Sequence, residues 1–563
     1  MSAEFPTALI LILGALGVPF LRGRARAAWM LALPVLAFAQ IVALPLGEYA
    51  QVEFLGETLV LMRADRLSLA FGYIFAIATL LNVIYSLHDE DTVQQVAALA
   101  YAGSALGAVF AGDLITLFIY WELTAVTSVA LIWARRTERS RRAAMRYLLV
   151  QLASGMLLLA GAVLHFQASA SIRFDLLGLA TPGGWLILLA FGIKCAFPLL
   201  HNWLQDAYPE ATVTGTVWLS AFTTKLAVYA LARGYAGTEM LIWIGALMTA
   251  FPIFYAVIEN DLRRVLAYSL NNQLGFMVVG VGIGTELAIN GTVAHAFSHI
   301  LYKALLFMSM GAVLLRAGTV NGSQLGGLYK SMPWTTGFCI VGAASISAFP
   351  LFSGFISKAL ILSAAADGGY TITWLVLLFA SAGVFHHSGI KIPYFAFFAH
   401  DSGIRCAEAP RNMLLAMGLT AALCIGIGVY PKPLYDLLPY AVSFVPYTGA
   451  HVLTQLQLLL FSALAFSVLM RTGLYPPELR AVNLDSDWFY RRIAPAMVGA
   501  LGAGIAAMRL ALEETLLRVG APLVQVVLRL HAHGGPLART LSTGAMALWI
   551  SALLAVYLVM YYV

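Results

Sequence analysis

Apolar runs of about 20 residues recur along the whole of this sequence, each long enough to cross a bilayer as a helix. Residues 5–21, 67–87 and 541–563 are clear cases, because none has a polar face at helical spacing. Of 563 residues, 61% are hydrophobic and only 11% are charged. A soluble all-α protein has no core that could bury so many helices that are apolar all round. The sequence therefore predicts an all-α polytopic membrane protein.

The hydrophobic pattern predicts about 14–16 transmembrane helices. The candidate spans lie near 5–21, 28–47, 66–87, 94–111, 113–134, 143–166, 184–200, 212–233, 238–258, 262–284, 287–316, 334–365, 373–398, 411–430, 453–471 and 541–562. Residues 49–64 alternate in polarity, which predicts a small β-hairpin outside the membrane.

The spans group into a predicted domain organisation. The groups are N-terminal helices with the hairpin (1–92), a first five-helix repeat (93–233), a second, inverted five-helix repeat (238–398), additional helices (411–471), an amphipathic lateral segment (480–535) and a C-terminal transmembrane helix (541–563). Each repeat contains an odd number of spans, so we expect the two repeats to have opposite orientations in the membrane.

The arginine clusters predict the orientation of the chain. They follow odd-numbered spans, at 22–26, 135–142, 263–264 and 405–411. Because basic loops stay in the cytoplasm, this pattern places both termini outside. The net charge of +6 belongs to these loops, so it indicates membrane orientation and argues against nucleic-acid binding.

The segment 480–535 mixes acidic residues and arginines with apolar residues, for example at Asp485, Arg491 and Glu513. A long helix that lies on the membrane surface explains such an amphipathic pattern. An irregular cytoplasmic tail is the alternative. The break His533-Gly534-Gly535-Pro536 then separates this segment from the final spanning helix.

Six ionisable residues lie inside otherwise apolar spans. They are Glu122, Lys194, Lys225, Lys303, Lys358 and Lys391. A lysine at the centre of a spanning helix costs roughly 2.5–3.5 kcal/mol on insertion scales, so such residues usually face a bundle interior or a hydrated path. A lysine in an apolar interior can be charged or neutral at working pH, so a row of them can pass protons. The alternative is a set of static buried ion pairs that fixes helix packing.

Two of these lysines lie beside helix-breaking residues. Lys194 precedes Pro198, and Lys358 follows Pro350 and Gly354. Interrupted helices at corresponding places in inverted halves are typical of secondary transporters, and the freed backbone groups need polar partners.

His295, His299 and Lys303 are spaced four residues apart, so they line one helix face. Histidine titrates near neutrality, and the stripe is therefore a candidate proton wire. A metal site is disfavoured because no carboxylate or third histidine lies along this helix.

Lys391 lies two residues before Pro393. Two roles are open for it: a member of the proton relay, or a stabiliser of the helix break at the proline. His386 and His387 nearby either extend a relay or sit in a polar pocket. The four cysteines show no CxxC spacing, and the chain has no flavin fingerprint, so we expect neither cofactor nor metal.

Several motifs resemble one known family. They are Ala64-Asp65-Arg66-Leu67-Ser68, Trp121-Glu122-Leu123, Phe191-Gly192-Ile193-Lys194, Leu266-Ala267-Tyr268-Ser269, the stretch 299–307 and the stretch 350–358. In this order they are similar to the antiporter-like membrane subunits shared by respiratory complex I and Mrp-type cation/proton antiporters, and most similar to the D-type chain of Mrp. The resemblance covers roughly 60–430.

The resemblance implies roles for single residues. Glu122 and Lys194 match the essential glutamate and the broken-helix lysine of the family, and Lys225 matches the lysine of the following helix. Lys303 matches the central lysine, and Lys358 matches the lysine of the second broken helix. In the family these residues form two half-channels joined by a central axis.

Two departures from the family pattern stand out. Asn271, Asn272 and Gln273 replace the small or hydroxylated residues and the histidine of many relatives, which predicts a differently hydrated pocket. The 485–490 motif and the surface helix resemble the complex I subunit that carries a long lateral helix.

The leading hypothesis is a proton-translocating subunit of a multisubunit Na⁺/proton antiporter in a bacterial inner membrane. Its expected partners are other membrane subunits, protons, sodium and the lipid bilayer. The alternatives are a proton-pumping membrane subunit of a complex I-like NADH:quinone oxidoreductase and an energy-coupling subunit of an inorganic-carbon uptake complex. The chain itself is expected to be a transporter subunit without redox centres. An inert scaffold would keep each buried charge at a cost without return.

Overall fold

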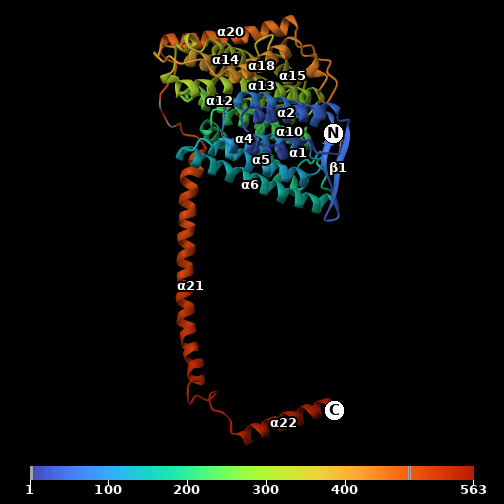
Figure 1. Ribbon diagram of the computed structural model, residues 1–563, viewed down its shortest axis with the longest axis vertical. Helices are drawn as coiled ribbons and strands as arrows, with labels where there is room; N and C mark the ends of the chain where they lie inside the picture. Colours follow the sequence, from blue (N-terminus) through green and yellow to red (C-terminus); the bar gives the residue numbers. More distant parts are fainter. Residues whose placement is uncertain (1–3, 480, 482, 563) are drawn as a thin grey trace. The chain divides into compact units, whose positions relative to one another are not determined.

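Helices make up nearly all of the regular structure of this chain (Figure 1). The computed structural model describes residues 4–479, 481 and 483–562. They divide into two units, Met1–Asn483 and Leu484–Val563.

The N-terminal part of the first unit holds the hairpin and the first set of helices. Its elements are α1 (Thr7–Ala15), η1 (Val18–Phe20), α2 (Gly23–Ala43), β1 (Gly47–Phe54), β2 (Glu57–Ala64), α3 (Arg66–Ser86), α4 (Thr92–Phe110), α5 (Leu114–Trp133), α6 (Glu138–Ser169), α7 (Pro182–Lys194), α8 (Asn202–Ala207), η2 (Tyr208–Glu210), α9 (Gly215–Ala221) and α10 (Thr223–Gly234).

The remainder of the first unit is helical throughout. Its elements are α11 (Met240–Ile258), α12 (Leu262–Ile283), α13 (Glu286–Ala317), η3 (Gly322–Gln324), η4 (Leu328–Lys330), α14 (Pro333–Ile346), α15 (Ser353–Asp367), α16 (Thr371–Val384), η5 (Phe385–Ile390), α17 (Lys391–Pro393), η6 (Tyr394–Phe398), α18 (Arg411–Val429), α19 (Lys432–Tyr435) and α20 (Gly449–Thr472).

In the described part of the chain, 12 helices are long and apolar enough to cross a membrane, by length and composition. Two shorter apolar helices, Thr7–Phe20 and Pro182–Lys194, lie below this length. The multi-span class is therefore confirmed, although several predicted spans differ in detail. The span expected at 334–365 is two helices, α14 and α15, and the span expected at 212–233 is divided between α9 and α10.

The predicted hairpin is present. Strands β1 and β2 pair antiparallel from Gly47 opposite Ala64 to Phe54 opposite Glu57. The turn uses left-handed backbone at Leu55 and Gly56, with φ of 52° and 85°. Asp113, at the start of α5, accepts a hydrogen bond from the Val60 backbone N–H at 2.8 Å, so the hairpin is joined to the helical bundle.

Helices α5 and α12 begin in the same way. Asp113 caps α5 and Asp261 caps α12, each with its carboxylate on two backbone N–H groups of the first turn. Leu114 N–H donates to Ile172 O at 2.8 Å, and Leu262 N–H donates to Val320 O at 3.0 Å. Each helix start is thus tied to the loop that follows the next helix, a local match of the kind that a duplicated unit produces. The repeat boundaries and their inversion stay predictions.

One arginine predicted to lie in a cytoplasmic loop is buried instead. Arg263 lies in the first turn of α12 with 1% of its surface exposed. Its guanidinium donates to the backbone carbonyls of Ala211 and Thr212 at 3.1 and 3.0 Å. It therefore links α12 to the segment before α9, and the arginine cluster at 263–264 gave no sign of this contact.

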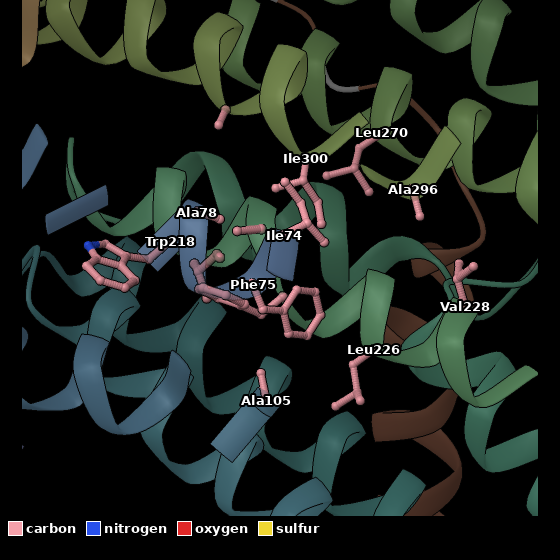
Figure 2. Packing of buried hydrophobic residues seen from close by; sticks show 14 of the residues in the cluster. Ile74, Phe75, Ala78, Ala105, Trp218, Leu226, Val228, Leu270, Ala296 and Ile300 are labelled. Carbon is pink, nitrogen blue, oxygen red and sulfur yellow. The ribbon is translucent and has the colours of Figure 1, made fainter. Parts of the chain in front are cut away.

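A single hydrophobic cluster runs through most of the first unit. Figure 2 shows Phe75 of α3, Leu226 of α10 and Ile300 of α13 in one packed region. Phe75 meets Phe222 edge to face, with ring centroids 5.2 Å apart. This apolar packing surrounds the buried lysines described below.

The second unit contains η7 (Phe489–Ile493), α21 (Ala494–His531) and α22 (Thr543–Tyr562). Ion pairs one turn apart, such as Arg509 with Glu513 at 2.8 Å, lie along α21. The predicted break after 531 is confirmed, because α21 ends at His531 and Gly534 has a φ of 95°. The position of α21 on the membrane surface stays a prediction.

Candidate functional site: the row of buried lysines

The first broken helix ends at Lys194. After it, Ala196 and Leu199 take left-handed backbone, with φ of 61° and 70°. Ala196 N–H donates to Ile193 O, and Phe197 N–H donates to Gly192 O, which is the hydrogen-bond pattern of a helix end closed by a left-handed residue. Pro198 cannot continue the helix, so the chain turns before α8 begins at Asn202.

The Lys194 ammonium is fully buried and faces α5. Its Nζ donates to Trp121 O at 2.5 Å and to Thr124 Oγ1 at 2.7 Å, and it lies 4.4 Å from the centroid of the Trp121 ring. All three contacts come from one turn of α5. The lysine is therefore held by neutral acceptors and by an aromatic face.

Glu122 follows Trp121 directly, so its carboxylate starts from the same turn of α5 that holds Lys194. Its Oε1 is buried without a hydrogen-bond partner among the described residues. A Cβ at Gly155 of α6 would lie 1.3 Å from this oxygen, so only a glycine leaves room for the carboxylate here. Across the described part of the chain, no ion pair of 4.0 Å or less joins Glu122 to Lys194.

The second broken helix repeats the first residue by residue. The sequence Ala-Phe-Pro-Leu stands at 196–199 and again at 348–351. Ala348 and Leu351 have φ of 56° and 76°, and Phe349 N–H donates to Ala344 O as Phe197 N–H does to Gly192 O. The tetrapeptide is a sequence signal that pairs the two breaks directly.

Lys358 reaches the second break from the opposite side. It lies in α15, after the break, and its Nζ donates to Ile346 O at the end of α14 at 2.8 Å. The ring of Phe276 lies 5.1 Å from the same nitrogen. Ile346 occupies the place before Ala-Phe-Pro-Leu that Lys194 occupies in the first break, so both ammonium groups lie close to the ends of their first half-helices.

Lys225 marks a third interruption. Helix α9 ends at Ala221 and α10 starts at Thr223, and the Lys225 Nζ donates back to Ser220 O at 2.6 Å. A cation at the carboxyl end of a helix interacts favourably with the helix dipole. The Thr224 hydroxyl beside it is buried and has no partner among the described residues.

Lys303 is held by α12 as Lys194 is held by α5. Its Nζ donates to Ser269 Oγ at 2.8 Å and lies 3.4 Å from Leu266 O, a hydroxyl and a carbonyl three residues apart. Ser388 also donates to Ser269 Oγ, at 2.7 Å, and His387 Nδ1 lies 2.9 Å from Ser388 Oγ. The motif at 266–269 had singled out Ser269, whereas no sequence signal indicated Ser388.

The predicted stripe on α13 is only partly connected. His295 Nδ1 lies 3.0 Å from Ser357 Oγ, and its Nε2 lies 3.4 Å from Tyr302 Oη. His299 stacks on His295 with ring centroids 6.2 Å apart, and both of its ring nitrogens are buried without a partner among the described residues.

Lys391 differs from the other four lysines because it forms an ion pair. Its Nζ lies 2.8 Å from Glu478 Oε1 and donates to Val257 O and Glu259 O at 2.6 and 2.7 Å. These carbonyls lie at the end of α11. For Lys194, Lys225, Lys303 and Lys358, no carboxylate lies within 4.0 Å in the part of the chain that the structure describes.

The arrangement has a clear chemical consequence. Four ammonium groups are buried on hydroxyl, carbonyl and aromatic acceptors, and such acceptors do not fix the charge of a lysine as a carboxylate partner does. Each can therefore give up and regain a proton without breaking an ion pair.

Comparisons with known proteins show the family of this chain. Residues 111–386 match the family described as NADH:quinone oxidoreductase/Mrp antiporter, transmembrane. The N chain of the NADH-quinone oxidoreductase of Desulforudis audaxviator is 32% identical over 369 residues, which are 60% of this chain and 73% of that protein. This chain belongs to that family. It is an antiporter-like membrane subunit of the kind shared by Mrp and complex I-like complexes.

One further sequence relative and one solved structure show the range of similar proteins. The D chain of the Na⁺/H⁺ antiporter of Alkalihalophilus pseudofirmus is 29% identical over 358 residues, 59% of this chain and 71% of that one. A chain of the membrane-bound sulfane sulfur reductase, an archaeal respiratory membrane complex, has the same fold with a TM-score of 0.72 at 21% identity. That match covers 99% of this chain and 100% of the other.

Proposed function

We propose that this chain moves protons across a membrane along the buried row of Glu122, Lys194, Lys225, Lys303 and Lys358, with His295 and His299 near the centre. The observation that carries the proposal is that four of these lysines are buried without a carboxylate partner within 4.0 Å among the described residues. Each such lysine costs roughly 2.5–3.5 kcal/mol of insertion free energy in a spanning helix. A role in proton transfer explains why the chain retains these lysines despite that free energy.

The proposed setting is a multisubunit monovalent cation/proton antiporter in a bacterial inner membrane, with sodium as the coupled ion and other membrane subunits as partners. The similarity to the D chain of the Na⁺/H⁺ antiporter supports this setting. The arginine clusters support termini outside the cytoplasm.

Substitution of Lys194 tests the proposal. In energised vesicles that contain the assembled complex, Lys194→Ala and Glu122→Ala should each abolish proton-coupled transport while assembly, measured on native gels, is unchanged. The matched control is Asp436→Asn, which removes an exposed carboxylate that pairs with Lys432 at 2.8 Å and should leave transport normal. Normal transport in Lys194→Ala would overturn the proton row.

A second candidate is a pump module driven by electron transfer in partner subunits. The length of the structural match favours this second candidate. A chain of a respiratory membrane complex aligns with 99% of this chain, including the C-terminal helices. Purification of the assembly from its native membrane, with a visible spectrum and identification of the other subunits, separates the two settings. Colourless small membrane proteins support the antiporter, and flavin or iron–sulfur absorbance supports the pump. A colourless large soluble partner favours an inorganic-carbon uptake complex.

A further inference from the structure

A line of polar contacts leaves the central lysine and leads toward the end of α11. Ser269 Oγ accepts from Lys303 at 2.8 Å and from Ser388 Oγ at 2.7 Å. Because Ser388 donates to Ser269, its oxygen accepts from the Nδ1–H of His387, at 2.9 Å. All four side chains are fully buried. These contacts join α12, α13 and the segment after α16.

The backbone that carries His387 and Ser388 is unusual. Helix α16 continues into the π-helical turn η5 (Phe385–Ile390) before α17 begins at Lys391. A π-helical turn inside an α-helix is uncommon and is frequent at functional sites. Lys391 lies one turn beyond His387 on the same segment, and His387 Nε2 is buried and makes no hydrogen bond among the described residues.

At the far end of the line, Lys391 meets Glu478. The side chain of Lys391 is 0% exposed, that of Glu478 is 5% exposed, and Nζ lies 2.8 Å from Oε1. Glu478 stands after the end of α20, outside the spanning helices. It lines an open pocket of about 330 Å³ together with Ser323, His400 and Tyr475. Glu478 thus lies between a buried lysine and the pocket, with both carboxylate oxygens buried.

The pocket lies where several interhelical loops meet. Its lining comes from η3, η6, the end of α20 and the loops that follow η6 and α20. It lies beside the turn between α11 and α12, where Ser323 N–H donates to Asn260 Oδ1 at 3.0 Å. The charged and titratable groups around Glu478 are Lys391, Glu259, Tyr475 and His386, and the ring of His386 stacks on that of Tyr475 with centroids 5.5 Å apart. Burial raises the pKa of Glu478, and Lys391 only partly opposes this rise.

We propose that Glu478 is the residue through which protons pass between this pocket and the buried lysine row, by way of Lys391, His387, Ser388 and Ser269. The proposal rests on the proposed function. In the transfer step, an N–H bond of the Lys391 ammonium breaks and an O–H bond of Glu478 forms, which leaves a neutral amine and a carboxylic acid. The acid then returns its proton to water in the pocket, and the amine takes the next proton from the His387 side.

A static ion pair that fastens the 473–479 segment to the bundle is the competing explanation, and two variants separate the two. Glu478→Gln keeps the size of the side chain and one oxygen that accepts a hydrogen bond, but its amide does not take up a proton. It should lower proton-coupled transport by roughly tenfold or more, since a positioned acid–base group contributes on that scale or above. The double variant Lys391→Gln with Glu478→Gln removes both charges, so a static pair predicts recovered transport and the proton route predicts continued loss.

Three outcomes decide the matter when Lys194→Ala is measured in the same vesicles. Normal transport in Lys194→Ala overturns the proposed function and the Glu478 route with it. Loss in Lys194→Ala with normal transport in Glu478→Gln, or recovery in the double variant, overturns the Glu478 route alone. Loss in Lys194→Ala, Glu478→Gln and the double variant supports both.

If Glu478→Gln fails to assemble, modification of the intact complex decides. His400 is exposed and lines the pocket, so a His400→Cys variant in a Cys406→Ser background places a thiol there after assembly. A charged thiosulfonate reagent should slow transport at least severalfold in this variant and not in the Cys406→Ser parent. Full transport after complete modification would overturn the route through the pocket.

Discussion

The two broken helices of this chain share a backbone and differ in how they present their lysines. Both use Ala-Phe-Pro-Leu with left-handed alanine and leucine. In the first, Lys194 precedes the break and contacts α5 at Trp121, the residue directly before Glu122. In the second, Lys358 follows the break and donates to Ile346 O. When α5 and α12 are aligned on their capping residues Asp113 and Asp261, Leu270 occupies the position of Glu122.

The two breaks therefore share a backbone conformation, but the position of the lysine relative to the break differs. A broken helix exposes carbonyl oxygens inside the membrane, and these need donors. Lys358 supplies a donor to its own break, whereas Lys194 donates to the neighbouring helix. The lysine of the first break therefore contacts the neighbouring helix α5, whereas Lys358 donates within its own pair of half-helices. Gln455 of α20 adds a second donor to the second break, to Ser347 O at 3.2 Å.

The largest expected effect on transport comes from replacing either Lys194 or Lys358 by arginine in separate variants. Arginine keeps the positive charge but does not deprotonate in proteins. Lys194→Arg and Lys358→Arg should therefore each lower transport by roughly tenfold or more. The measurement is proton-coupled transport in vesicles with matched amounts of assembled complex. If one arginine variant transports normally, that break needs only a fixed charge, and the two breaks have different roles.

The second largest effect on transport is expected from a substitution beside Glu122, near the first break only. Gly155→Ala would place a Cβ 1.3 Å from the present position of Glu122 Oε1. The carboxylate must turn away, so transport should fall severalfold while the complex still assembles. Gly426→Ala in α18, with no atom within 4 Å of the new Cβ, is the control and should transport normally. Unchanged transport in Gly155→Ala would mean that the position of the carboxylate is unimportant.

A loss of stability is expected from a substitution at the second break. A Cβ at Gly354 would lie 1.8 Å from Ser345 O, a backbone atom that cannot move cheaply. Gly354→Ala should therefore lower the free energy of unfolding by about 1–3 kcal/mol, seen as a lower midpoint of thermal denaturation of the purified complex. Gly337→Ala in α14, where the new Cβ meets nothing within 4 Å, should keep the midpoint or raise it slightly. Equal midpoints for both variants would argue against close packing of α15 on α14.

The smallest expected effect tests the likeness of the two breaks. Ala196 and Ala348 both have positive φ, which glycine adopts without steric cost. Ala196→Gly and Ala348→Gly should each stabilise the complex by up to about 1 kcal/mol and by similar amounts. Thermal midpoints measured side by side check this, and opposite signs would show that the surroundings of the two breaks differ more than their backbones do.

Much of the fold follows from local sequence. Apolar runs without a polar face specify membrane helices, alternating polarity at 49–64 specifies the hairpin, and Gly534 with Pro536 specifies the break after α21. The same local signals predicted interruptions beside Lys194 and Lys358. They did not predict that the span at 212–233 divides into α9 and α10, because the apolar run continues through Phe222.

The candidate site divides in the same way. The sequence by itself determined that five lysines and a glutamate lie in apolar spans, because residue type and hydropathy are local properties. Only the tertiary structure decided which acceptor holds each lysine: Ser269 for Lys303, Ile346 O for Lys358 and Glu478 for Lys391. The physical reason is that two of these contacts join residues far apart in the chain, so helix packing fixes their geometry and no spacing within a single helix records it.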